Sequence, residues 1–184
     1  MIEAPLDEGR TAQILSWLET VTDKPVTHVV QSHHHVDHSA GLRSMAGLTG
    51  ATVVAGAAAV PLYENAFTAE SQVVPDGVDG SGIEIVAVGA ESVTLDDSTN
   101  PVTAYPFGNP HAEDYVLVDA AGALWVVDIL SPQTGAPFPQ FLADFSHSTH
   151  VAMRGQVTPE LTRMTCWHAS WRASRTNSLP TCMR

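Results

Sequence analysis

The chain has 184 residues and a mass of 19.6 kDa, which is enough for one domain with a sizeable core and too short for two. Its formal net charge of −12 argues against nucleic acid or an anionic membrane as a partner, because both would repel it. No apolar run is long enough to span a membrane and the first residues are unlike a signal peptide, so we expect a soluble, cytoplasmic protein.

The start of the chain predicts a strand and then a helix. Residues 2–5 are expected to be the end of a buried strand that is stopped by proline. A helix is predicted over about residues 9–21, where Ile14, Leu18 and Val21 recur at helical spacing.

A second strand is predicted next. Residues 26–31 are short and β-branched, and they lead into a histidine-rich loop that opens a helix by about residue 43. Residues 52–54 are a further strand candidate. Residues 57–60 are expected to form a helical turn that ends before Pro61.

The second half of the chain predicts mostly short strands. Residues 72–82 are rich in glycine, proline and aspartate, which indicates a surface loop. Residues 115–118 and 124–127 flank a turn sequence and predict a hairpin. Three more strands are expected, at residues 83–88, 92–95 and 102–106. This order, β-α-β and then mostly β, predicts the α/β or α+β class.

Charge divides the chain near residue 150. Residues 1–150 hold 19 of the 20 acidic residues and three basic ones, whereas residues 151–184 hold one acidic residue and five arginines. Both cysteines also lie after residue 150, and two cysteines confined there do not indicate a disulfide framework. We therefore divide the chain into a domain of residues 1–150 and an atypical basic tail of residues 151–184. The tail is either a frameshifted or fused segment or a basic C-terminal helix packed on an acidic body.

Four potential metal ligands lie within six residues: His33, His35, Asp37 and His38. Imidazole nitrogen suits zinc and similar metals, and the carboxylate widens the choice. Residues two apart in an extended loop project to the same side, so His33 and His35 are expected to grip one ion. Asp37 and His38 would turn toward a second position. A histidine tag is the competing interpretation, but a tag lies at a terminus and lacks the interleaved aspartate.

These residues resemble the signature of the metallo-β-lactamase superfamily, His-x-His-x-Asp-His after a strand. The run from Thr27 to Arg43 fits that signature closely. Upstream, residues 2–5 resemble the strand that carries an acid behind the metal ligands. Downstream, residues 108–114 resemble the segment that supplies a third histidine, and residues 125–128 resemble the strand that ends in a bridging aspartate. The resemblance covers about residues 1–135 and implies an αββα sandwich.

The resemblance implies a ligand set and a reaction. His33, His35 and His111 would hold a first ion, and Asp37, His38 and Asp128 a second, with Asp128 bridging. Glu3 would orient a ligand histidine through its outer nitrogen. The expected cofactor is one or two divalent ions, zinc first, with manganese, iron or calcium as alternatives. The expected reaction is hydrolysis of an ester, a lactone or a related carbonyl compound by metal-activated water, with Asp37 moving the proton.

Two departures from the family pattern matter. The family's usual strands before Ile2 are absent, so we expect a fold incomplete at the N-terminus, with a sheet edge that a homo-oligomer or the tail would cover. The family's final ligand histidine has no counterpart followed by glycine after Asp128; the substitutes are His147, His150 and His168. Two alternative functions therefore stay open: a non-catalytic or weakly active metal-binding remnant, and an iron-dependent oxidoreductase on the same fold.

Overall fold

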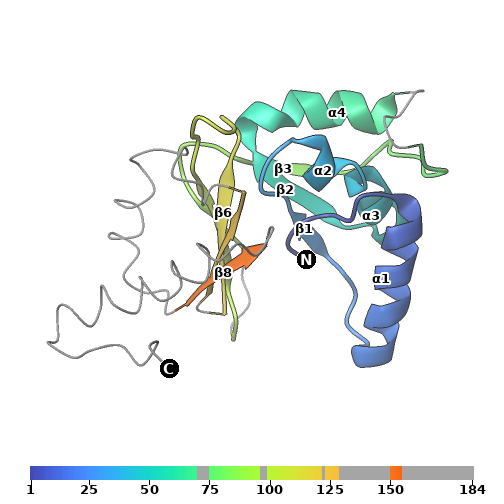
Figure 1. Cartoon of the computed structure of the whole chain (residues 1–184). Helices are drawn as coiled ribbons and strands as arrows, with labels where there is room; N and C mark the ends of the chain where they lie inside the picture. The colour runs from blue at the N-terminus through green and yellow to red at the C-terminus, as the bar shows by residue number, and fades with distance from the viewer. Residues whose placement is uncertain (70–74, 96–98, 122, 129–149, 155–184) are drawn as a thin grey trace, which may run out of the picture.

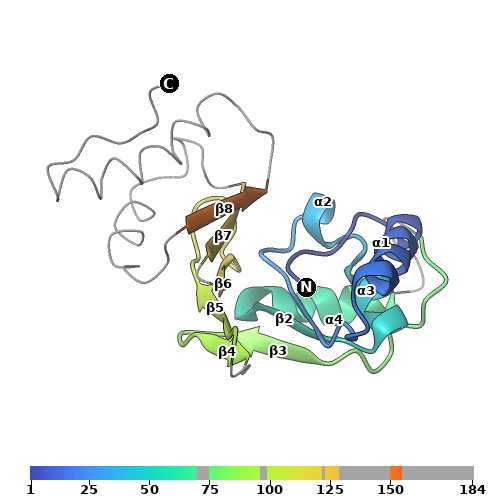
Figure 2. The same cartoon turned by 90° about the horizontal axis from the view of Figure 1, so that it is seen from below.

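The computed structural model describes residues 1–69, 75–95, 99–121, 123–128 and 150–154. These residues form two β-sheets, and helices cover the outer face of the first sheet (Figures 1 and 2). The mixed α/β class and the helix-sheet-sheet layers agree with the expected sandwich. Among the described residues, no helix covers the outer face of the second sheet.

The first sheet is parallel and carries the short central strands. Its order is β1 (His28–Val30), β2 (Thr52–Gly56) and β3 (Ile85–Val88). The strands are rich in valine, and all residues of β2 except the first are buried. Such burial is expected for a parallel sheet that is covered on both faces. Their carboxyl ends therefore lie at one edge of the sheet.

The second sheet has five strands in the order of the chain. They are β4 (Val93–Leu95), β5 (Val102–Pro106), β6 (Val116–Ala120), β7 (Ala123–Val127) and β8 (His150–Arg154). Neighbours pair in antiparallel fashion except β7 and β8, which are parallel. The predicted hairpin is confirmed as β6 and β7. Strand β8 crosses the boundary that the charge pattern placed after residue 150.

Four α-helices and one 3-10 turn complete the described chain. They are α1 (Glu8–Val21), α2 (Val36–Ser39), α3 (Leu42–Thr49), the turn Ala57–Ala59 and α4 (Val60–Thr68). The side chain of Asp7 caps α1 by accepting a hydrogen bond from the backbone N–H of Arg10 at 2.8 Å. The helix predicted over residues 9–21 is therefore confirmed. None of the helices in the described chain is long and apolar enough to cross a bilayer.

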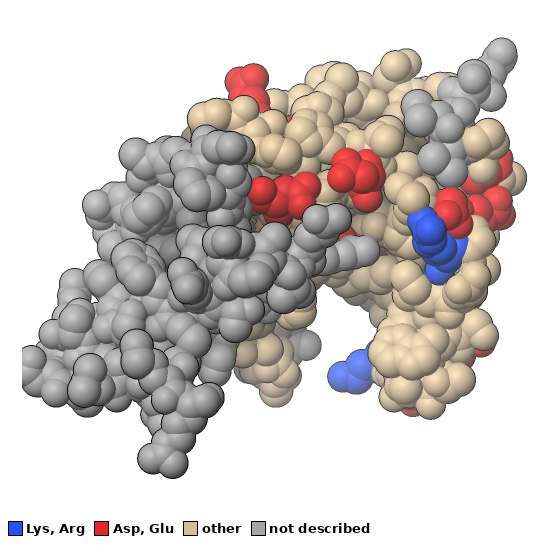
Figure 3. Space-filling model, in the orientation of Figure 1, with Lys and Arg blue, Asp and Glu red and all other residues tan. Residues whose placement is uncertain are grey.

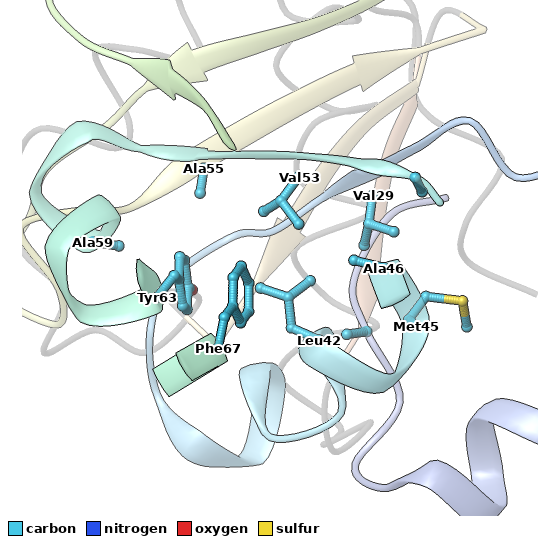
Figure 4. Packing of buried hydrophobic residues seen from close by; sticks show 11 residues of the cluster. Val29, Leu42, Met45, Ala46, Val53, Ala55, Ala59, Tyr63 and Phe67 are labelled. Atoms are coloured by element: carbon cyan, nitrogen blue, oxygen red, sulfur yellow. The ribbon is translucent and has the colours of Figure 1, made fainter. Parts of the chain in front are cut away.

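The apolar core has three parts, one between the helices and the first sheet, one between the two sheets and one on the outer face of the second sheet. Leu42 and Phe67 from the helices pack against Val29 and Val53 of the first sheet (Figure 4). A second cluster fills the space between the sheets, and a third lies on the other face of the second sheet. Alternate residues of β6 explain this division, because Val116 and Val118 belong to the inter-sheet cluster and Leu117 to the outer one.

Two local expectations were wrong. Residues 2–5 do not form a strand: Ile2 makes only an isolated bridge to Val30, and the φ of 65° at Glu3 takes the backbone out of the extended conformation. The helical turn expected to end before Pro61 instead continues as α4, with Pro61 in its first turn. Proline is compatible with that position because the N–H it lacks would have no partner there.

The N-terminal residues lie along the outer side of β1. Besides the Ile2–Val30 bridge, the Val30 N–H donates to the carbonyl of Met1 and the Glu3 N–H donates to the carbonyl of Val30, both at 2.9 Å. The edge of β1 that was expected to be exposed is therefore partly paired by residues 1–3, and the same pairing fixes the position of Glu3.

Gly56 lets the segment before β6 approach the end of β2. A Cβ at this position would lie 1.9 Å from the carbonyl oxygen of Asp114. We expect Gly56→Ala to lower the free energy of unfolding by about 1–3 kcal/mol, because backbone must move on one side or the other. Gly89→Ala is the matched control, since nothing lies within 4 Å of its Cβ. Urea unfolding of both variants tests this, and equal stability would contradict it.

Candidate metal centre

The candidate ligands come from loops that leave the strands at one edge of the sheets. The residues from His33 to His38 follow β1, His111 lies in the segment before β6, and Asp128 follows β7. Asp37 and His38 are not in an open loop, since the motif itself starts the short helix α2. Ser39 ties this helix to the preceding chain, because its hydroxyl donates to the carbonyls of His34 and His35 at 2.8 and 3.0 Å.

Three histidines face a common point. Single ring nitrogens of His33, His35 and His111 lie within 4.8 Å of one another. The Nε2 atoms of His33 and His111 are 3.1 Å apart, and the ring centroids of His35 and His111 are 4.6 Å apart. The structure therefore brings together the three residues predicted for the first metal position.

A second group shares His33 with the first. His33, His38 and Asp128 offer ligand atoms within the same 4.8 Å limit. The Nε2 atom of His38 lies 2.7 Å from Oδ2 of Asp128, and that oxygen lies 3.9 Å from Nε2 of His111. Asp128 thus lies between His38 and His111, where a bridging ligand is expected.

Asp37 takes a different place from the one expected. Its carboxylate belongs to neither group, its side chain is 73% exposed, and its Oδ2 lies 3.4 Å from Nε2 of His38. The turn of α2 directs Asp37 toward solvent while His38 points inward. Asp37 is near enough to exchange a proton at the site, but as placed it is not among the converging ligand atoms.

Glu3 holds His38 from behind. Its Oε2 lies 2.6 Å from Nδ1 of His38, and its Oε1 accepts a hydrogen bond from the Ser32 N–H at 2.8 Å. The side chain is only 2% exposed. This is the contact predicted for an acid that orients a ligand through its outer nitrogen. Because Nδ1 faces the carboxylate, Nε2 is directed toward Asp128.

Both carboxylates that flank His38 come from strained backbone. Glu3 and Asp128 have φ values of 65° and 58°, in the left-handed region that residues with a Cβ seldom adopt. Such conformations cost about 1–3 kcal/mol and persist where surrounding structure imposes them. At each residue the turn of the backbone brings the carboxylate to one nitrogen of His38.

Tyr115 is a supporting residue that the sequence did not reveal. Its ring stacks on His33 with centroids 5.4 Å apart, and its hydroxyl donates to the carbonyl of Val127 while accepting from the Val127 N–H. Tyr115 therefore ties the end of β7, next to Asp128, to a ligand histidine. A buried tyrosine next to a strand usually indicates only core packing, so no pattern in the sequence distinguished it.

Burial and charge shift two ligand histidines in opposite directions. Burial first, and then the charged forms of the neighbouring histidines with His38 foremost, together lower the pKa of His33 to about 3. Burial alone would also lower the pKa of His38, but the hydrogen bonds and charges of Glu3 and Asp128 outweigh it and raise that pKa to about 8. At neutral pH, His33 is therefore ready to bind a metal, whereas His38 first gives up a proton.

The donor atoms fit a zinc-like ion. Nitrogens bound to zinc in a tetrahedral site, at about 2.0–2.1 Å from the ion, lie roughly 3.3 Å from each other, close to the 3.1 Å between His33 and His111. A neutral His33 and an oriented His38 add to that fit. On the face seen in Figure 3, acidic side chains are spread over the described surface and basic ones are sparse, which favours attraction of cations.

A sequence profile of the Metallo-beta-lactamase superfamily matches residues 5–113, more than half of the chain. The chain belongs to this superfamily. The match includes the motif from His33 to His38 and also His111, and it ends before Asp128. Hydroxyacylglutathione hydrolase from Ectopseudomonas mendocina (strain ymp) is 38% identical over 55 residues, which are 30% of this chain. The match spans only 21% of that relative's length.

Solved structures of the superfamily share the fold. A metallo-beta-lactamase from Pontibacter korlensis superposes with a TM-score of 0.60 at 18% identity, covering 83% of this chain and 73% of its own. The enzyme from Hirschia baltica gives 0.59 at 15% identity, covering 91% and 78%. FIM-1 from Pseudomonas aeruginosa, solved in a mono-zinc form, gives 0.59 at 16% identity, covering 94% and 78%.

The substitutes considered for a final ligand stay predictions. His147 and His168 lie outside the described residues, and His150 is described only as the first residue of β8. The boundary between the domain and the basic tail likewise stays a prediction, because most of residues 151–184 lie outside the described part of the chain.

Glu3 should affect metal affinity without being a ligand. Glu3→Gln removes the negative charge that orients His38, so we expect the affinity for zinc to fall by about 10–100-fold. Glu64→Gln, on the exposed side of α4, is the matched control. Competition with a chromogenic chelator measures both variants. Equal zinc affinity in Glu3→Gln and the control would contradict this role.

His38 should link the stability of chelator-treated protein to pH. Its pKa of about 8 in the folded chain lies above the roughly 6.5 of an unfolded chain, so the folded state binds the proton more tightly. The stabilisation is full below about pH 6.5 and is lost as pH rises through about 8. The difference in unfolding free energy between wild type and His38→Asn should therefore be larger at about pH 6 than at about pH 9. A difference that grows toward high pH would contradict it.

Proposed function

We propose that the protein is a metal-dependent hydrolase that uses activated water to cleave an ester, lactone or thioester of a small molecule. The observation that carries the proposal is the convergence of His33, His35 and His111, with Asp128 placed between them and His38. Membership of the superfamily and the partial match to a hydroxyacylglutathione hydrolase support hydrolysis. We propose zinc as the ion because most of the donors are imidazole nitrogens.

His33, His35 and His111 would hold the first ion, and His38 and Asp128 would complete the site beside it. A divalent ion bound there lowers the pKa of water toward about 7 and polarises a carbonyl group. Glu3 keeps a proton on Nδ1 of His38, so that Nε2 faces the site. Asp37, exposed at 3.4 Å from His38, would take a proton from the attacking water and deliver it to the leaving group.

Removing one histidine of the first group tests the proposal. Wild type and His35→Ala are loaded with zinc and assayed on an aryl ester, a lactone, a thioester and a chromogenic β-lactam. We expect wild type to hydrolyse at least one of them. The activity of His35→Ala should fall by more than the roughly 10–100-fold that follows from loss of a residue that only orients a ligand. His28→Ala is the matched control, because His28 lies at the start of β1 outside the cluster.

Two outcomes would contradict the proposal. If zinc-loaded wild type and His35→Ala are equally inactive on every substrate although wild type binds zinc, the chain is a metal-binding remnant without this activity. If protein purified without chelator contains iron and only the iron form is active in an oxidation assay, the oxidoreductase alternative holds. Elemental content measured before any metal is added separates these cases.

A further inference from the structure

One histidine in the motif does not face the ligand cluster. His34 lies between His33 and His35, but its Nδ1 lies 2.7 Å from Oδ1 of Asp114. The His34 side chain is 39% exposed, whereas that of Asp114 is 3% exposed. No other described residue forms a hydrogen bond with the His34 ring. The pair therefore joins a buried carboxylate to an imidazole that is open to solvent on its other side.

Both members of the pair are held in place through their backbones. The carbonyl of His34 accepts the hydroxyl of Ser39 at 2.8 Å, which fixes the turn that carries it. The carbonyl of Asp114 packs against Gly56, where a side chain would leave no room. The Val116 N–H donates to the carbonyl of Ser32 at 2.7 Å and so ties the two segments together. The contact between His34 and Asp114 is thus between two preorganised groups.

Asp114 differs from Glu3, the buried carboxylate behind His38, in how its oxygens are used. Glu3 is equally buried and uses both oxygens, one of them on a backbone N–H. Asp114 uses one oxygen on His34, while its buried Oδ2 has no hydrogen-bond partner among the described residues. A buried carboxylate with an unused oxygen costs stability, which calls for a role beyond anchoring. We expect Asp114 to act through His34, which is the hydrogen-bond partner of its side chain.

The position of His34 suggests what it contacts. Its ring centroid lies 4.9 Å from that of His35, so the ring borders the metal centre. In a neutral ring the proton sits on Nδ1, where the carboxylate of Asp114 accepts it, and Nε2 is then a hydrogen-bond acceptor. The exposed edge next to the centre therefore offers an acceptor to whatever the centre binds.

We propose that His34 is a substrate-binding residue, positioned by Asp114, that accepts a hydrogen bond from a hydroxyl or amide N–H near the scissile carbonyl. This inference rests on the proposed hydrolase function and narrows its substrates to acyl groups that carry such a donor. The hydrogen bond is lost when the donor is removed from the substrate or when the ring is replaced.

Matched substrates test the contact. Zinc-loaded wild type, His34→Phe, His34→Gln and Asp114→Asn are assayed on the lactoyl, N-acetylalanyl and propanoyl thioesters of one thiol. We expect wild type to prefer at least one donor-bearing substrate over the propanoyl compound in kcat/KM. His34→Phe should reduce that ratio roughly three- to tenfold, the value of one hydrogen bond. His34→Gln should keep part of the ratio, because its side-chain carbonyl is also an acceptor.

The ratio separates binding from structural damage, since a disturbed fold slows all three substrates alike. Asp114→Asn should lower the ratio less than His34→Phe, and His28→Phe should leave it at the wild-type value. A ratio in His34→Phe equal to that of His28→Phe would overturn the proposal. If only the lactoyl or only the N-acetylalanyl ratio falls, the donor is a hydroxyl or an amide N–H, respectively.

A binding measurement keeps this test separate from that of the hydrolase function. The dissociation constants of lactate, N-acetylalanine and propanoate for zinc-loaded wild type and His34→Phe are measured by calorimetry. Loss of wild-type selectivity in His34→Phe supports the contact even if wild type hydrolyses none of the thioesters, esters, lactones and β-lactams tested, in which case the hydrolase proposal alone fails. Hydrolysis of the thioesters with unchanged selectivity in both measurements refutes the contact alone.

Discussion

The chain of contacts from Glu3 through His38 to Asp128 is the interaction on which the site depends. It joins residues 35 and 90 positions apart, and so connects the N-terminus, the histidine motif and the end of β7. The segment around Glu3 is also held by backbone pairing along β1 and by Ala4, which is buried in the core. The position of the His38 ring therefore depends on how the N-terminal segment, the motif after β1 and the end of β7 are arranged.

Burial of Glu3 is compatible with stability because its charge is matched on both oxygens. An unpaired carboxylate in such a place would cost several kcal/mol. The Ser32 N–H and the His38 ring satisfy it. The contacts of His38 with Glu3 and Asp128 raise the pKa of His38, whereas burial lowers that of His33, which stays neutral. One network thus stabilises the fold and sets different protonation states on two adjacent ligands.

The part of the site that the sequence could predict was the part close together along the chain. His33, His35 and His38 share one short turn, so their spacing was enough, whereas His111 and Asp128 could be assigned only through a resemblance. The outward position of Asp37 depends on where α2 starts, a choice of one residue that spacing does not resolve. The contacts of Asp114 with His34 and of Tyr115 with Val127 depend on strand packing, which no local pattern reports.

The two candidate metal positions cannot both be filled as they stand, because each of them uses His33. Each histidine offers one ligand atom, and that of His33 is counted in both groups. Once His33 serves the first ion with His35 and His111, only His38 and Asp128 of the converging described residues are left for a second. Asp37 could join them only by turning inward from its exposed position. The described residues thus provide one complete three-histidine position, and Asp128 beside it is better placed to bridge than to hold an ion alone.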